Sequence, residues 1–159
     1  MIVIINGAPA SGKTKTAKLL SESIDKSALI DGDWLLATHP HDHGDQRYLR
    51  YKNITSLAKN YHEAGFTNIF IAFVYARAED ITEQVNQLAE IDTVKVFALT
   101  PHADTLKKRH SEDDYNRANI DETLDLHSKI QALESMEIID NTNLSPEEVV
   151  EQIKSKLVE

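Results

Sequence analysis

Apolar residues along the chain form short continuous runs and longer periodic stretches. The continuous runs lie at residues 2–5, 28–30, 69–75, 94–99 and 136–139, and they predict strands buried on both faces. Apolar residues spaced three and four apart predict amphipathic helices at residues 13–24, 48–61, 79–89, 104–110, 120–133 and 146–157. The alternation of strand and helix predicts one α/β domain over residues 1–159, with a parallel sheet covered on both faces.

Two helix boundaries carry specific sequence signals. Gly65 follows the helix predicted at residues 48–61, at the position where a left-handed C-cap belongs. Ser145, Pro146 and Glu148 have the spacing of an N-cap, a first helical residue and the third helical position of a capping box. These three residues predict that the last helix begins at residue 146.

The first predicted strand runs into a loop with two glycines. Residues 7–14 fit the pattern G-x-x-x-x-G-K-[ST] at every required position. Glycines let backbone N–H groups approach a phosphate chain, and the following helix directs the positive end of its dipole toward the anion. The pattern predicts that nucleotide phosphates bind to Gly7, Ala8, Pro9, Ala10, Ser11, Gly12, Lys13, Thr14 and the amide of Lys15.

The side chains of Lys13 and Thr14 indicate which cofactors the loop would bind. The Lys13 ammonium would lie on the β- and γ-phosphates, and the Thr14 hydroxyl would ligate Mg²⁺. ATP and Mg²⁺ are therefore the expected cofactors.

Two acidic residues follow the second predicted strand. Asp31 and Asp33 are separated by one glycine, at the sheet edge where ligands of parallel sheets bind. Phosphoryl transfer to a hydroxyl needs a carboxylate that accepts the proton, and Mg²⁺ needs oxygen ligands. We expect Asp33 to accept the proton, and Asp31 to hold Mg²⁺ through water or to act as the alternative base. The other interpretation is a solvated turn, since Asp-Gly is common in turns.

A polar loop near residues 34–47 is the candidate wall of the acceptor pocket. It begins with Trp34, the only tryptophan, for which a place in the core is the alternative. It also contains three closely spaced histidines, His39, His41 and His43. We expect these histidines to face solvent or substrate, and a transition-metal site is the alternative.

Cationic residues indicate further contacts with substrates. Four of them flank the polar residues 111–116 of a lid predicted near residues 110–118, namely Lys107, Lys108, Arg109 and Arg117. Kinase lids carry such cations onto phosphates, so we expect Arg109 and Arg117 to close on the bound substrates. The other interpretation is neutralisation of a helix C-terminus. Arg77 follows the third predicted strand and would bind the acceptor or the phosphoryl group, unless it is an ordinary surface residue.

The charge balance narrows the class of substrate. The chain has 17 Lys and Arg against 26 Asp and Glu, a net charge of −9. Proteins that wrap nucleic acid show a basic patch, so a neutral or cationic small molecule is the expected acceptor. The chain has no cysteine and no run near the roughly 18 apolar residues of a membrane span, and we expect no signal peptide, because residues 2–5 are too short for its apolar region. We expect a cytoplasmic monomer or homodimer.

Residues 7–14, the pair Asp31 and Asp33, and residues 141–148 together resemble the P-loop small-molecule kinases. This superfamily includes nucleoside-monophosphate, shikimate, gluconate and adenylylsulfate kinases, and chloramphenicol phosphotransferase-like proteins. The layout is also similar to tunicamycin-resistance-type ATP-binding proteins. The resemblance implies a three-layer α/β/α P-loop NTPase fold with a five-stranded sheet of order 2-3-1-4-5. It also implies that Arg109 stacks on adenine and that the loop containing Asn143 borders the base.

The main functional hypothesis is an ATP- and Mg²⁺-dependent kinase that phosphorylates a hydroxyl of a small molecule. Two alternatives remain: a polynucleotide 5′-hydroxyl kinase, and a non-catalytic ATP-binding or resistance module. The third predicted strand does not end in an aspartate that would hold Mg²⁺. Asp31 is therefore the expected partner of the metal.

Overall fold

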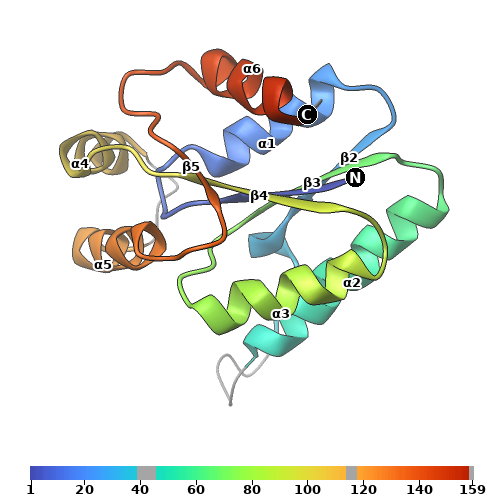
Figure 1. The fold of residues 1–159 in the computed structure, drawn as a ribbon. Coiled ribbons are helices and arrows are strands. Elements are labelled where there is room, and N and C mark those ends of the chain that lie inside the picture. The colour runs from blue at the N-terminus through green and yellow to red at the C-terminus, as the bar shows by residue number, and fades with distance from the viewer. Residues whose placement is uncertain (39–45, 114–117, 158–159) are drawn as a thin grey trace.

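The computed structural model describes residues 1–38, 46–113 and 118–157 and shows three layers, helices–sheet–helices (Figure 1). The strands are β1 (Ile2–Asn6), β2 (Ser27–Asp31), β3 (Asn68–Phe73), β4 (Val94–Leu99) and β5 (Glu137–Ile139). They form one parallel sheet of order β2-β3-β1-β4-β5. This confirms the predicted fold class and strand order, and it places β1 at the centre.

Helices cover both faces and one end of the sheet. One face carries α1 (Lys13–Ser23) and α6 (Pro146–Leu157), and the other carries α2 (Arg47–Glu63) and α3 (Ala78–Ala89) (Figure 1). The end where the strands finish is flanked by α4 (Ala103–Glu112) and α5 (Ile120–Gln131). A short 3-10 helix, η1 (Gly32–Trp34), follows β2. No described helix has the length and apolar character of a membrane span.

Alternate residues of β1 pack into the two halves of the core. Ile2 and Ile4 belong to the cluster under α2 and α3, whereas Val3 and Ile5 belong to the cluster under α1 and α6. All four side chains are fully buried, which explains why the strand reads as a continuous apolar run. Each such side chain stabilises the fold by about 1.5–3 kcal/mol. The central strand is therefore a rigid support for the loop that follows it.

Several element boundaries differ from the prediction because pairing and capping decide them. β2 is one residue longer at each end than predicted, since its register with β3 extends over five residue pairs. β3 ends at Phe73 rather than at residue 75, because its last pairing with β1 joins Phe73 to Asn6. α4 continues to Glu112, into the stretch predicted as a polar connector.

Both predicted helix boundaries are confirmed. Gly65 has φ of 93°, and the amide of Phe66 donates to the carbonyl of Tyr61 at 3.0 Å, as in a left-handed C-cap. The amide of Ser145 donates to Glu148 Oε2 at 2.7 Å, and the amide of Glu148 donates to Ser145 Oγ at 3.2 Å. These reciprocal bonds are those of a capping box.

Candidate functional site

The loop predicted to bind phosphates connects the end of β1 to the start of α1. Gly12 has φ of 100°, which favours glycine, and Ala10 also takes the left-handed conformation, with φ of 63°. Gly7 is needed for a different reason, since a Cβ there would lie 2.2 Å from Ser11 Oγ. Consecutive turns of this kind direct backbone N–H groups into a concave surface suited to an anion.

A cleft of about 610 Å³ opens over this loop. Most of the loop residues predicted to bind nucleotide line it, together with Asp33 and Arg109. Two lining residues had no role in the sequence analysis: Lys18, one turn beyond Lys15 on α1, and Asp113, directly after α4. The structure therefore gathers the predicted catalytic and nucleotide-binding side chains at the carboxyl edge of the sheet.

Lys13 is the buried cation of the cleft. Its side chain begins α1, and the residue is only 8% exposed. Burial lowers its pKa from the ordinary value, and the nearby charges of Asp33, Asp31 and Asp113 counteract this effect only in part. Among the described residues, no carboxylate forms an ion pair with Lys13 within 4.0 Å. A phosphate group beside Lys13 would supply a counter-charge for the buried ammonium.

Asp31 forms hydrogen bonds with both Thr14, the other predicted Mg²⁺ ligand, and Asp33, the predicted proton acceptor. Its Oδ2 accepts a hydrogen bond from Thr14 Oγ1 at 3.2 Å, and its Oδ1 accepts one from the amide of Asp33 at 3.1 Å. Gly32, between the two acids, lies against the Phe73 ring, where a Cβ would come within 2.5 Å of the ring carbon Cδ2. The hydroxyl and carboxylate predicted to hold Mg²⁺ are thus already adjacent, and both are oxygen ligands of the kind that Mg²⁺ prefers.

The Arg109 side chain links α4 to the phosphate-binding loop by hydrogen bonds. Its guanidinium donates to the carbonyl of Asn141 at 2.8 Å and to the carbonyl of Ser11 at 3.5 Å. The Asn141 side chain adds a bond of 2.9 Å from its Nδ2 to the same Ser11 carbonyl. Of the four basic residues predicted around the lid, Arg109 reaches the cleft, whereas Lys107 pairs with Asp104 on α4.

A second cavity of about 210 Å³ lies beside Arg109. It is lined by Gly12, Lys15, Thr16, Arg109, Asn141, Leu144, Pro146 and Val149. Asn141 Oδ1 is buried here without a hydrogen-bond partner among the described residues. The cavity combines apolar side chains with the polar residues Lys15, Arg109 and Asn141, a mixture that suits a nucleobase. Asn143, predicted to border the base, is exposed, and Asn141 is the neighbouring residue that reaches the cavity.

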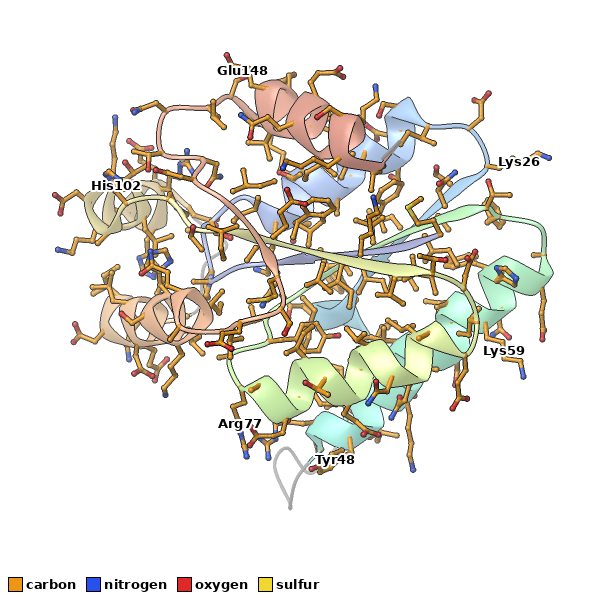
Figure 2. All side chains as sticks on the ribbon, viewed as in Figure 1. Lys26, Tyr48, Lys59, Arg77, His102 and Glu148 are labelled. Carbon is orange, nitrogen blue, oxygen red and sulfur yellow. The ribbon has the colours of Figure 1, made fainter. Side chains whose placement is uncertain are left out.

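The residues predicted to contact the acceptor are less closely gathered. Trp34 is 85% exposed on η1, which excludes the core position that was its alternative. Arg77 pairs with Glu79 at the start of α3, and Figure 2 shows it at the surface, as it does Tyr48 at the start of α2. Arg117 and the histidines His39, His41 and His43 lie outside the described residues. Their predicted roles, including the metal alternative, stay predictions.

Arg50 is a candidate acceptor residue that the sequence analysis missed. Its guanidinium lies over the Phe73 ring, 5.1 Å from the centroid, and the same ring lies against Gly32 between the two acids. Its Nε is buried and has no hydrogen-bond partner within the part of the chain that the structure describes. Arg47, one turn earlier on α2, pairs with Asp80 at 3.5 Å, so the two arginines differ. Only tertiary contacts distinguish them, because in sequence both read as ordinary helix-surface arginines.

The chain was compared with known proteins. No family model matches it, and no curated protein sequence matches it. Solved structures do. The tunicamycin resistance protein of Deinococcus radiodurans is 20% identical with a TM-score of 0.73, covering 98% of this chain and 94% of that protein. A sugar kinase from Janibacter sp. HTCC2649 is 18% identical with a TM-score of 0.76, covering 99% and 94%.

A third structure gives the same result. The shikimate kinase of Bacteroides thetaiotaomicron is 21% identical with a TM-score of 0.68, covering 100% of this chain and 99% of that protein. At such identities the similarity concerns the fold, which in every case extends over the full length. The chain therefore has the fold of the P-loop small-molecule kinases, which confirms the resemblance seen in its sequence.

Proposed function

We propose that the chain is an ATP- and Mg²⁺-dependent kinase that transfers a phosphoryl group to a hydroxyl of a small molecule bearing an anionic group. One observation carries the reaction type. Lys13, the bonded pair Thr14 and Asp31, and Asp33 come together at one cleft from α1, β2 and η1. This set contains a cation that would bind the transferred group, oxygen ligands for Mg²⁺ and a carboxylate that would accept the hydroxyl proton.

Each group has one role in the proposed reaction. The free N–H groups of the loop and the N-terminus of α1 bind the phosphate chain, and Lys13 binds the group being transferred. Thr14 and Asp31 would hold Mg²⁺, which neutralises phosphate charge when bound. Asp33 orients the acceptor hydroxyl and takes its proton as the oxygen attacks the γ-phosphorus. The bond from that phosphorus to the β-γ bridging oxygen breaks, which leaves ADP.

Arg50 supports an anionic acceptor. The Arg50 guanidinium lies over the Phe73 ring, and its Nε is buried without a hydrogen-bond partner among the described residues. A guanidinium donates hydrogen bonds in a planar fork that matches a carboxylate, sulfate or phosphate. The Phe73 ring also lies against Gly32 in the Asp-Gly-Asp turn, so we propose that a small hydroxylated anion contacts both Arg50 and Asp33. This proposal departs from the expectation of a neutral or cationic acceptor, which rested on the net charge of −9 and not on the site.

The experiment is a phosphoryl-transfer screen with Mg·ATP against matched acceptors. Hydroxy acids and sugar acids are compared with neutral sugars and with aminoglycosides, and ADP formation is measured. Wild type is compared with Arg50→Gln and with Lys52→Gln, which removes the same charge from an exposed position on the same helix. We expect turnover with a hydroxylated anion. Arg50→Gln should raise its KM by roughly 10-fold or more, the usual cost of losing a charged hydrogen bond.

Two outcomes would overturn the proposal in different ways. If only neutral or cationic acceptors are phosphorylated, and Arg50→Gln and Lys52→Gln have equal effects, the anionic acceptor is wrong. The proposal of a kinase would still stand. Tight binding of Mg·ATP without turnover of any acceptor would favour a non-catalytic nucleotide-binding module.

A further inference from the structure

The side chain of Asn6, the last residue of β1, makes three hydrogen bonds to backbone groups and one from its Nδ2 to Met136 Sδ at 3.3 Å. The residue is fully buried. Its Oδ1 accepts the amide of Gly7 at 2.8 Å and the amide of Tyr75 at 2.9 Å. Its Nδ2 donates to the carbonyl of Tyr75 at 2.9 Å. One amide side chain thus makes three bonds to the backbone, one of them to the first residue of the phosphate-binding loop.

The position of Asn6 explains why the backbone needs these bonds. The register between β1 and β3 ends with the pair Asn6 and Phe73, where both strands leave the sheet. Beyond that point Tyr75 has no neighbouring strand, although its residue is fully buried. Buried backbone groups must be paired, and an asparagine amide has the donor and acceptor of a peptide group. The side chain of Asn6 therefore acts as one additional rung between two diverging chains.

Tyr75 is in turn fixed at its other end. Its hydroxyl donates to Gln84 Oε1 on α3 at 3.1 Å, and its ring lies 5.2 Å from Phe73 and 5.6 Å from Tyr51, centroid to centroid. Phe73 contacts Gly32 in the Asp-Gly-Asp turn. Asn6 thus joins the start of the phosphate-binding loop to the aromatic layer beneath the acceptor side.

We propose that Asn6 is a positioning residue that sets the loop's shape before nucleotide arrives, by holding Gly7 against the end of β3. The proposal rests on nucleotide binding by this loop. Because the Gly7 amide is already bonded to Asn6, Gly7 contributes shape and not a donor to the phosphates. Fixing the loop in advance leaves less conformational freedom to be lost on binding, which strengthens binding.

The first test measures the loop without any ligand. Amide hydrogen exchange is followed by NMR in wild type, Asn6→Ala and Thr55→Val. The Thr55 hydroxyl, on α2, bonds Gln84 and Gln87, and Gln84 accepts from the Tyr75 hydroxyl, so Thr55→Val disturbs the far end of the Tyr75 side chain without touching Asn6. We expect Asn6→Ala to speed exchange at Gly7 and Tyr75 roughly 10-fold or more, as loss of a buried bond implies. Thr55→Val should leave the Gly7 amide protected, because the bond from Gly7 to Asn6 is kept.

The second test measures Mg·ATP affinity in the same variants. We expect the Kd of Asn6→Ala to rise about 10-fold, with no change for Thr55→Val. If Asn6→Ala lowers the melting temperature but leaves loop exchange and Kd at the control values, Asn6 is merely structural and the proposal is wrong. If wild type itself fails to bind Mg·ATP, the proposed function is wrong, and the exchange experiment still decides the role of Asn6.

Asn6→Asp gives a test that does not depend on the folding of the alanine variant. It keeps the acceptor atoms for Gly7 and Tyr75 but turns a second carboxylate oxygen toward the Tyr75 carbonyl. That contact is repulsive while the acid is ionised, and the protonated acid can donate as asparagine does. We expect exchange at Gly7, normalised for intrinsic rates, to slow toward wild type as pH falls. A defect that is the same at every pH would overturn the assignment.

Discussion

The hydroxyl of Thr14 donates a 3.2 Å hydrogen bond to Oδ2 of Asp31, which joins the first turn of α1 to the end of β2. The residues after Phe73 at the end of β3 are Val74 and Tyr75, so β3 has no carboxylate beside the loop. Asp31, from the neighbouring strand β2, lies beside the Thr14 hydroxyl. In the proposed reaction this carboxylate would hold Mg²⁺ in place of an acid at the end of β3.

Replacing Lys13 should separate stability from phosphate binding. Lys13→Ala removes a cation whose pKa is lowered by burial, so we expect no loss of thermal stability. It also removes the charge proposed to bind the transferred group, so kcat/KM should fall by about 10²-fold or more. Melting curves and phosphoryl transfer measure the two effects, with Lys18→Ala at the rim of the same cleft as control. Turnover near the wild-type rate would contradict the role given to Lys13.

Amide substitutions should distinguish the two acids. Asp33→Asn should lower kcat by about 10²- to 10⁴-fold, the usual contribution of a general base, with little change in the Kd for Mg·ATP. Asp31→Asn should instead raise the Mg²⁺ concentration needed for half-maximal rate, because it weakens the preformed partner of Thr14. Steady-state rates over a Mg²⁺ series measure both. If Asp33→Asn turns over normally, the base is Asp31.

Arg109 should matter for nucleotide affinity through its two carbonyl contacts. Arg109→Lys keeps the charge but cannot reproduce the planar fork that reaches both Ser11 and Asn141. We expect the Kd for Mg·ATP to rise by roughly 10-fold, as loss of a charged hydrogen bond implies. Isothermal titration measures it. Lys129→Ala on α5, which breaks an exposed pair with Asp125, is the control. Equal affinities for the two variants would show that Arg109 is dispensable.

The capping box of α6 should make stability depend on pH. Hydrogen bonds from the amide and then the side chain of Ser145 lower the pKa of Glu148 below its ordinary value of 4.5. A lowered folded-state pKa means that this stabilisation is present above pH 4.5 and is lost as pH falls through the lowered pKa. Urea unfolding from pH 7 to 3 should show a Glu148→Gln deficit that shrinks on acidification. If the loss of unfolding free energy in Glu148→Gln is the same at every pH, the ionised Glu148 carboxylate is not its source.

The sequence predicted the fold well because the decisive signals were local. The apolar runs located all five strands, and β4 matched at both ends because Thr93 and Pro101 bound a continuous apolar segment. The loop at residues 7–14 and the following acids were also found locally, since their chemistry depends on close spacing. The strand order is different, because it came from resemblance and not from any local pattern.

Three contacts near the site that the sequence did not predict are long-range. In the sequence, Asn141 is one of several polar residues of its loop. The fold brings it into contact with Ser11, which lies 130 positions earlier in the chain. Arg50 looked like its neighbour Arg47, and only Phe73 and Asp80 distinguish their surroundings. The pairing of Asn6 with Tyr75 depends on where two strands diverge, which no spacing rule encodes.

The exposed position of Trp34 has a practical consequence. It is the only tryptophan of the chain, it is 85% exposed, and it directly follows Asp33 in η1. Its intrinsic fluorescence therefore comes from one known place beside the proposed acceptor site. Emission should shift to shorter wavelength when an acceptor shields the indole from water. Trp34 is thus an intrinsic fluorescence probe, and stopped-flow mixing can measure the rate of acceptor binding without an added label.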